Sequence, residues 1–260
     1  MTDKSTRDHI LEDIRSAAPF SAHATTPPRD LKGAYQLQDA VTESLTADPA
    51  FGSVAGWKIA ANSAALMARF GVDEPLSGRI FAGQRHNSPA NLKASAYRQF
   101  AIEPEIAAIM GATIAPQDVP YDTETVRQAI DRFVPSMELL DMRDADMPNI
   151  HLPDAVAQNI SNVGTVVGGP GIAPDQIDTA AIRMTLSLDG EILHDVTGGA
   201  PQRPLEAVTW LANHLSARGL SLQAGQVVLC GTHTPIWYHE GAGQITVSMS
   251  GLGEASLTME

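Results

Sequence analysis

From Val54 to Met259 the chain is a series of short apolar runs separated by turn residues, and this pattern limits the fold more than any other feature. Runs that are rich in β-branched and aromatic side chains and bounded by Gly, Pro, Asn or Asp predict strands. A body made mainly of strands is therefore expected. The predicted strands cover residues 54–60, 99–110, 133–141, 164–167, 183–188, 226–230, 244–250 and 254–259.

Helical spacing of apolar residues is concentrated before this body. Two helices are predicted at residues 5–17 and 30–47, joined by a loop at residues 25–30. The expected fold class is α+β, with a small N-terminal helical subdomain over residues 1–50 and a strand-rich domain over residues 51–260. Shorter helices are predicted within the body at residues 62–71, 123–133, 153–160 and 204–217.

Charge and cysteine content exclude several kinds of protein. The 30 acidic and 17 basic residues give a net charge of -13, which disfavours binding to the phosphates of nucleic acids. Cys230 is the single cysteine and cannot form an intramolecular disulfide, and no apolar run has the length of a signal sequence or a membrane span. We expect a cytoplasmic protein without nucleic-acid or membrane partners.

Motifs of several common enzyme classes are absent from the sequence. There is no Gly-x-Gly-x-x-Gly turn, no P-loop and no Gly-x-Ser-x-Gly elbow, so dinucleotide, nucleotide and α/β-hydrolase chemistry have no support. The eight histidines include no His-Glu-x-x-His pair, which makes a zinc site of that kind improbable.

Two acidic residues interrupt the apolar run at residues 99–110. Side chains two apart on a strand share a face, so Glu103 and Glu105 are expected to lie together, where a cation would relieve their repulsion. Pro104 cannot donate to a sheet ladder, which predicts a sheet edge or a bulge. The alternative is that both glutamates lie on the solvated face of a half-buried strand.

A third acid stands in the middle of the second strongly apolar strand. Glu138 would complete a set of three carboxylates, which suits Mg²⁺ or Mn²⁺ better than zinc or copper. Lys58 is the lone charge in the apolar run at residues 54–60. It could transfer a proton or pair with one of these carboxylates. The alternative for Lys58 is that it reaches solvent at the sheet edge.

Several segments, taken in order, resemble the 2-keto-4-pentenoate hydratase and 4-oxalocrotonate decarboxylase branch of the fumarylacetoacetate hydrolase superfamily. The resemblance runs from about residue 35 to the C-terminus. Its segments include Gly56-Trp57-Lys58-Ile59, Ile102-Glu103-Pro104-Glu105-Ile106-Ala107, Pro135-Ser136-Met137-Glu138-Leu139-Leu140-Asp141, Gln158-Asn159-Ile160-Ser161 and Gly225-Gln226-Val227-Val228-Leu229-Cys230-Gly231-Thr232.

The resemblance implies a catalytic body with a curled mixed β-sheet (β-roll) and assembly as a homo-oligomer. It also implies that Glu103, Glu105 and Glu138 hold Mg²⁺ or Mn²⁺ and that Lys58 and Glu105 are catalytic. A 2-oxo acid substrate would contact Lys58, Ser161 and Thr234.

The implied activity is that of a hydro-lyase in aromatic catabolism. A metal-dependent hydratase of this kind adds water to 2-hydroxypenta-2,4-dienoate and forms a 4-hydroxy-2-oxo acid. Departures from the family pattern, such as Gln158-Asn159-Ile160-Ser161 in place of Asp-Asn-Ala-Ser, leave three alternatives open. These are a decarboxylase, a carbon–carbon bond hydrolase of a related 2-oxo acid, and a relative that only binds metabolites.

Overall fold

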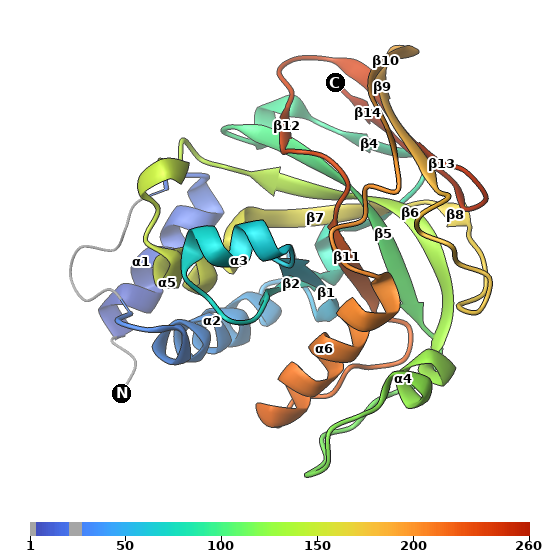
Figure 1. The fold of residues 1–260 in the computed structure, drawn as a ribbon. Coiled ribbons are helices and arrows are strands. Elements are labelled where there is room, and N and C mark those ends of the chain that lie inside the picture. The colour runs from blue at the N-terminus through green and yellow to red at the C-terminus, as the bar shows by residue number, and fades with distance from the viewer. Residues whose placement is uncertain (1–3, 21–27) are drawn as a thin grey trace.

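The computed structural model describes residues 4–20 and 28–260, which form two mixed β-sheets with helices beside the larger one (Figure 1). The larger sheet consists of β1 (Val54–Ala60), β2 (Leu76–Phe81), β3 (Arg85–Asn87), β5 (Phe100–Met110), β6 (Ile130–Asp141), β7 (Asn162–Val167), β11 (Val227–Thr232) and β12 (Trp237–Tyr238). Its order is β2-β1-β11-β5-β6-β7-β3, with β12 paired to β5. β1 runs parallel to β11 and antiparallel to β2, so the expected mixed sheet is confirmed.

The smaller sheet has the order β10-β9-β13-β14-β4, with β8 paired to β14. Of its β9–β10 hairpin, only the first strand was predicted from the sequence. Asp189 and Gly190 form the turn with φ of 52° and 85°, which is the Asp-Gly signal of a tight hairpin. The strands are β4 (Ala90–Leu92), β8 (Gly169–Pro170), β9 (Arg183–Leu188), β10 (Glu191–Thr197), β13 (Gly243–Met249) and β14 (Gly253–Met259).

Three helices pack together beside β2, as Figure 1 shows. They are α1 (Lys4–Ser16), α2 (Leu31–Thr46) and α5 (Leu152–Ala157). Asp30 caps α2 by accepting a hydrogen bond from the Gly33 N–H, and Phe81 of the sheet joins the apolar cluster between the helices. The small N-terminal helical part is confirmed, and the division of the chain at residue 50 stays a prediction. Residues 25–27 of the loop predicted at residues 25–30 lie outside the described residues.

The remaining helices are α3 (Ala64–Phe70), α4 (Thr123–Ala129) and α6 (Pro204–Ala217). Two of the predicted helices were too long. The helix expected at residues 123–133 ends at Ala129, because Ile130 is extended and pairs with Met110 at the start of the β5–β6 ladder. The helix expected at residues 153–160 ends at Ala157. No helix of the described residues has the length and apolar character needed to cross a membrane.

The prediction of an edge position for Pro104 was wrong, because β5 lies between β6 and β11. An irregularity does occur, but on the neighbouring strand, where the register of β11 against β5 shifts between Leu229 and Thr232. The carbonyl oxygen of Pro104 accepts a hydrogen bond from the His233 N–H, so the missing donor of Pro104 faces this irregular stretch. A proline is therefore tolerated in the middle of the sheet.

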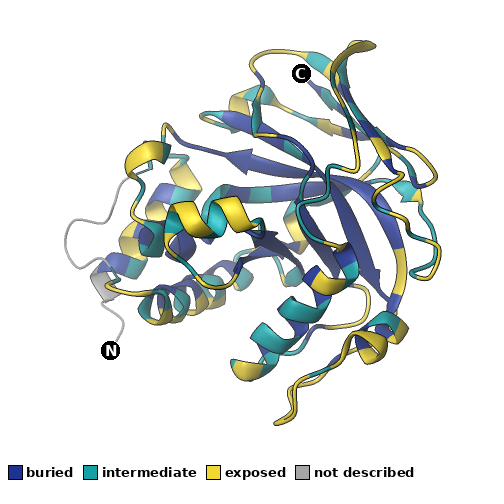
Figure 2. Cartoon of the chain, in the orientation of Figure 1, coloured by how far each residue is buried: buried dark blue, intermediate teal, exposed yellow. Residues whose placement is uncertain are grey.

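The two faces of β5 and β6 have different roles. Ile102 and Ile106 of β5 belong to the main core cluster, which also contains residues of the smaller sheet. Glu103, Glu105 and Glu138 therefore point to the opposite face, since neighbouring side chains on a strand alternate. Figure 2 shows that both strands are buried over most of their length, so this acidic face is not a solvated surface.

Candidate metal centre and active site

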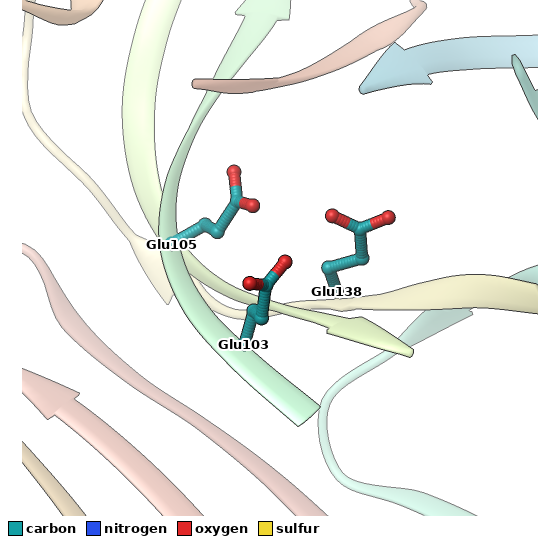
Figure 3. A group of neighbouring side chains, drawn as sticks. All are labelled: Glu103, Glu105 and Glu138. Atoms are coloured by element: carbon teal, nitrogen blue, oxygen red, sulfur yellow. The ribbon is translucent and has the colours of Figure 1, made fainter. Parts of the chain in front are cut away.

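The three glutamates form one cluster on the larger sheet. Glu103 pairs directly with Glu138 across the β5–β6 ladder, and Glu105 is two residues further along β5. Their carboxylates point into the same space (Figure 3), where one oxygen from each lies within 4.8 Å of the others. Glu105 and Glu138 are buried and Glu103 is half-buried. The alternative of a solvated face is therefore wrong.

Each buried carboxylate has one oxygen held by the protein. The Gly231 N–H donates to Glu105 Oε2 at 2.6 Å, and Asn162 Nδ2 donates to Glu138 Oε1 at 2.9 Å. The second oxygens, Glu105 Oε1 and Glu138 Oε2, are buried without a hydrogen-bond partner among the described residues. Buried polar atoms are rarely left unpaired, so this donor set fits a divalent cation bound between the carboxylates.

The pKa values of the cluster lead to the same conclusion. Burial, followed by repulsion from Glu138, raises the pKa of Glu103 to about 8. Burial also raises the pKa of Glu105 well above its ordinary value, and the Glu138 and Glu103 carboxylates act in the same direction. The protein alone therefore does not favour three ionised carboxylates here, whereas a divalent cation would favour them.

Lys58 is buried in β1, so the alternative of a solvent-exposed lysine is wrong. Its Nζ lies 3.2 Å from Glu138 Oε1, which realises the predicted pairing with a carboxylate of the cluster. Gly78 on the adjacent strand makes room for it, since a Cβ on Gly78 would lie 3.2 Å from Lys58 Cγ. The ion pair keeps the ammonium group next to the cluster.

Ser161 and Thr234 border the same cavity of about 590 Å³ as Lys58, Glu103 and Glu105. Ser161 ends a turn in which Asn159, Ile160 and Ser161 have φ of 63°, 51° and 62°. The Asn159 side chain fixes this turn to β2, because it accepts a hydrogen bond from the Arg79 N–H and donates to the Arg79 carbonyl. Of the predicted site residues, five therefore line one cavity, and the sixth, Glu138, lies behind them in contact with Lys58 and within the carboxylate cluster.

Two residues of the site escaped the sequence analysis. A glycine within a strand signals a bulge or a close approach, so Gly231 could have been noticed. Its φ is 110°, and a Cβ there would lie 2.5 Å from Asn62 Oδ1. Asn162 gave no such signal, because an asparagine at the start of a strand is common and its contact with Glu138 depends on the tertiary structure.

Replacing Asn162 with alanine is expected to weaken Mg²⁺ binding about tenfold or more, because Glu138 Oε1 loses the shorter of its two contacts and keeps only the one with Lys58. Calorimetric titration of the purified variant measures this change. Thr165→Val is the matched control, since Thr165 lies opposite Glu138 in the β6–β7 ladder and bonds the Met137 carbonyl, but makes none of the described hydrogen bonds of the Glu138 carboxylate. Equal losses in both variants would show that Asn162 acts only through the fold.

The family model described as fumarylacetoacetate (FAA) hydrolase C-terminal matches residues 62–259. The chain therefore belongs to the fumarylacetoacetate hydrolase family, and the resemblance seen in the sequence is confirmed. Among its relatives, 2-keto-4-pentenoate hydratase 1 of Dechloromonas aromatica (strain RCB) is 32% identical over 245 residues, which cover 94% of this chain and 90% of that protein. 2-Hydroxyhexa-2,4-dienoate hydratase of Comamonas testosteroni is 30% identical over 251 residues, which cover 95% and 92%.

A solved structure shows the same fold over nearly the whole chain. The 4-oxalocrotonate decarboxylase from Pseudomonas putida G7, complexed with magnesium and adipate, has a TM-score of 0.88 to this chain. The match covers 98% of this chain and 96% of that one at 24% sequence identity. The β-roll body with a small helical part, expected from the sequence, is thereby confirmed.

Proposed function

We propose that this chain is a divalent-metal-dependent hydratase of 2-hydroxy-2,4-dienoates in aromatic catabolism. A substrate such as 2-hydroxypenta-2,4-dienoate would gain one water and become a 4-hydroxy-2-oxo acid. The main support is the buried cluster of Glu103, Glu105 and Glu138, which contacts Lys58 and borders a cavity. Relatives that share 30% identity or more over nearly the whole chain are named hydratases. A protein that only bound metabolites would have little use for such a cluster.

The three glutamates would hold Mg²⁺ or Mn²⁺, because hard cations prefer carboxylate oxygens. When bound, the cation supplies Lewis acidity, which stabilises negative charge on the oxygens of a 2-oxo acid. Glu105 has a double role, since it would hold the cation and also borders the cavity with Lys58. Ser161 and Thr234 would hydrogen-bond the substrate through their hydroxyl groups.

The protein's own part in the reaction is mainly proton transfer. The dienol first becomes a 2-oxo acid when C5 receives a proton and the 2-hydroxyl group loses its own, and this makes C4 electrophilic. Water then adds at C4 while C3 gains a proton. Lys58 is the group that we assign to this proton handling, because its ammonium borders the cavity and pairs with Glu138. The homo-oligomer expected from the family resemblance stays a prediction.

The deciding experiment is an ultraviolet assay with freshly generated 2-hydroxypenta-2,4-dienoate, with and without Mg²⁺ or Mn²⁺, and with products identified by mass. We expect metal-dependent loss of the diene absorbance and a product heavier by one water. EDTA should stop the reaction and added Mg²⁺ should restore it. Release of carbon dioxide from a related 2-oxo dicarboxylic acid, without hydration of the dienoate, would replace the hydratase with a decarboxylase.

A further inference from the structure

The sheet face that carries the acids continues beyond them as an apolar surface. On β6 the residues that follow Glu138 on the same face are Leu140 and, just after the strand, Met142. Leu140 pairs with Ala101 of β5, and these three apolar residues form a buried cluster. Met147 and Ile236 pack against it, and both border the cavity with Leu140 and Met142.

A second group of residues that line the cavity is apolar as well. Leu66 and Phe70 of α3 line it, and none of the residues in Ala64–Phe70 is fully buried. Leu152 and Ile160 extend this group from the region of α5. The helix α3 therefore presents apolar side chains to the cavity, and these side chains are only partly buried by the rest of the protein.

Charged groups are scarce in this part of the cavity. Among the described residues that line it, the charged ones are Lys58, Glu103, Glu105 and Arg69. Arg69 is exposed, and its guanidinium donates to the Met147 carbonyl at 3.4 Å and lies over the Phe70 ring. A second carboxylate on the substrate would therefore enter apolar surroundings without a buried cation to pair with, which is unfavourable.

The length of the apolar region can be compared with that of the substrate. Strand residues advance about 3.3 Å each, so Leu140 lies about 7 Å beyond Glu138 along β6, and Met142 lies further. Three successive bonds of an extended chain advance only about 3.5 Å. A five-carbon dienoate held at the glutamates would therefore end before Met142, and would leave unfilled the apolar space that Met142 borders with Met147 and Ile236.

We infer that the substrate carries an uncharged apolar tail on C5, long enough to reach Met142, Met147 and Ile236. This inference rests on the proposed function, because it assumes that the 2-oxo acid head binds at the three glutamates. Met142, Met147 and Ile236 then determine specificity. Each buried methylene should tighten binding about fourfold until the tail fills the cavity. A carboxylate in place of the terminal methyl should weaken binding.

Saturated 2-oxo acids test the tail without depending on catalysis. The ligands are 2-oxobutanoate, 2-oxohexanoate and 2-oxooctanoate, titrated calorimetrically in the presence of Mg²⁺. 2-Oxoadipate serves as the matched dicarboxylate of 2-oxohexanoate. We expect affinity to rise along the series by about fourfold per methylene, and 2-oxoadipate to bind at least about tenfold more weakly than 2-oxohexanoate. A flat series, no binding, or a preference for 2-oxoadipate would overturn the inference.

A second cation at the end of the tail, beside the exposed Arg69, should reverse the preference. Ile236→Arg, at a partly exposed position, is expected to shift the affinity ratio of 2-oxoadipate to 2-oxohexanoate at least about tenfold toward the dicarboxylate. Met147→Arg serves if Ile236→Arg does not fold. Val119→Arg is the control, because Val119 is 70% exposed and does not line the cavity. An unchanged affinity ratio in both cavity variants would show that Ile236 and Met147 do not determine which ligand binds.

Failure of the inference and failure of the proposed function can be told apart. Hydration of 2-hydroxypenta-2,4-dienoate together with a flat binding series would contradict the tail alone. An affinity that rises with the length of the 2-oxo acid, without hydration of any dienoate, would contradict the proposed hydratase activity but support the apolar-tail specificity.

Discussion

Glu105→Gln is expected to abolish tight Mg²⁺ binding while the protein keeps its fold. Glutamine has the shape of glutamate and can still accept the hydrogen bond from the Gly231 N–H, but it carries no charge. Loss of a residue that only hydrogen-bonds a metal ligand lowers metal affinity by roughly 10- to 100-fold, and we expect the affinity for Mg²⁺ to fall by more than that here. Turnover should fall with it. Calorimetry for the metal, circular dichroism for the fold and the dienoate assay measure the three effects.

The metal-free variant should be at least as stable as the metal-free parent, because one of the mutually repelling buried carboxyl groups becomes neutral. Thermal unfolding in EDTA tests this. Glu124→Gln is the control, since it removes the same charge from an exposed position on α4. Unchanged metal affinity in Glu105→Gln would show that the cluster is not the cation site.

Lys58→Ala is expected to lower turnover by about 10²- to 10⁴-fold, the range over which a positioned acid or base acts. Mg²⁺ affinity should change much less, because Asn162 still donates to Glu138 Oε1 and the loss of a positive charge that repels the cation offsets the loss of the contact. The two readouts separate proton transfer from an indirect effect on the cation. Turnover close to that of the parent would reduce Lys58 to a structural role.

Lys58→Arg distinguishes proton transfer from charge alone. Arginine retains the positive charge beside Glu138 but does not deprotonate in proteins. If Lys58 transfers a proton, this variant should remain nearly as slow as Lys58→Ala. Recovery of turnover in a folded Lys58→Arg variant would show that only the positive charge is needed.

Alternation along strands made much of the site predictable. Glu103 and Glu105 had to share a face because one residue separates them in an apolar run. Glu138 was recognised as the one acid in the middle of a second such run, but its direct pairing with Glu103 depends on a register that a single sequence does not contain. The same limit applies to Asn162, whose contact with Glu138 joins separate strands.

Elements with few apolar residues were the ones missed. The strand β2 is buried throughout, yet it reads Leu-Ser-Gly-Arg-Ile-Phe, and its arginine is accommodated by Asp39 and Gln38 of α2. The strand β10 is mostly exposed and has no apolar alternation. Tertiary partners decide both cases, so local patterns could not reveal them.

The proline between Glu103 and Glu105 makes the backbone of the sheet part of the proposed cation site. Pro104 offers no N–H to β11, whose register shifts where the strands meet, and the Gly231 N–H of that stretch binds the Glu105 carboxylate. A regular hydrogen-bond ladder between β5 and β11 and a Gly231 N–H directed at the Glu105 carboxylate are therefore incompatible at this point of the sheet. An engineer who regularised this strand pair for rigidity would lose the donor that aims Glu105.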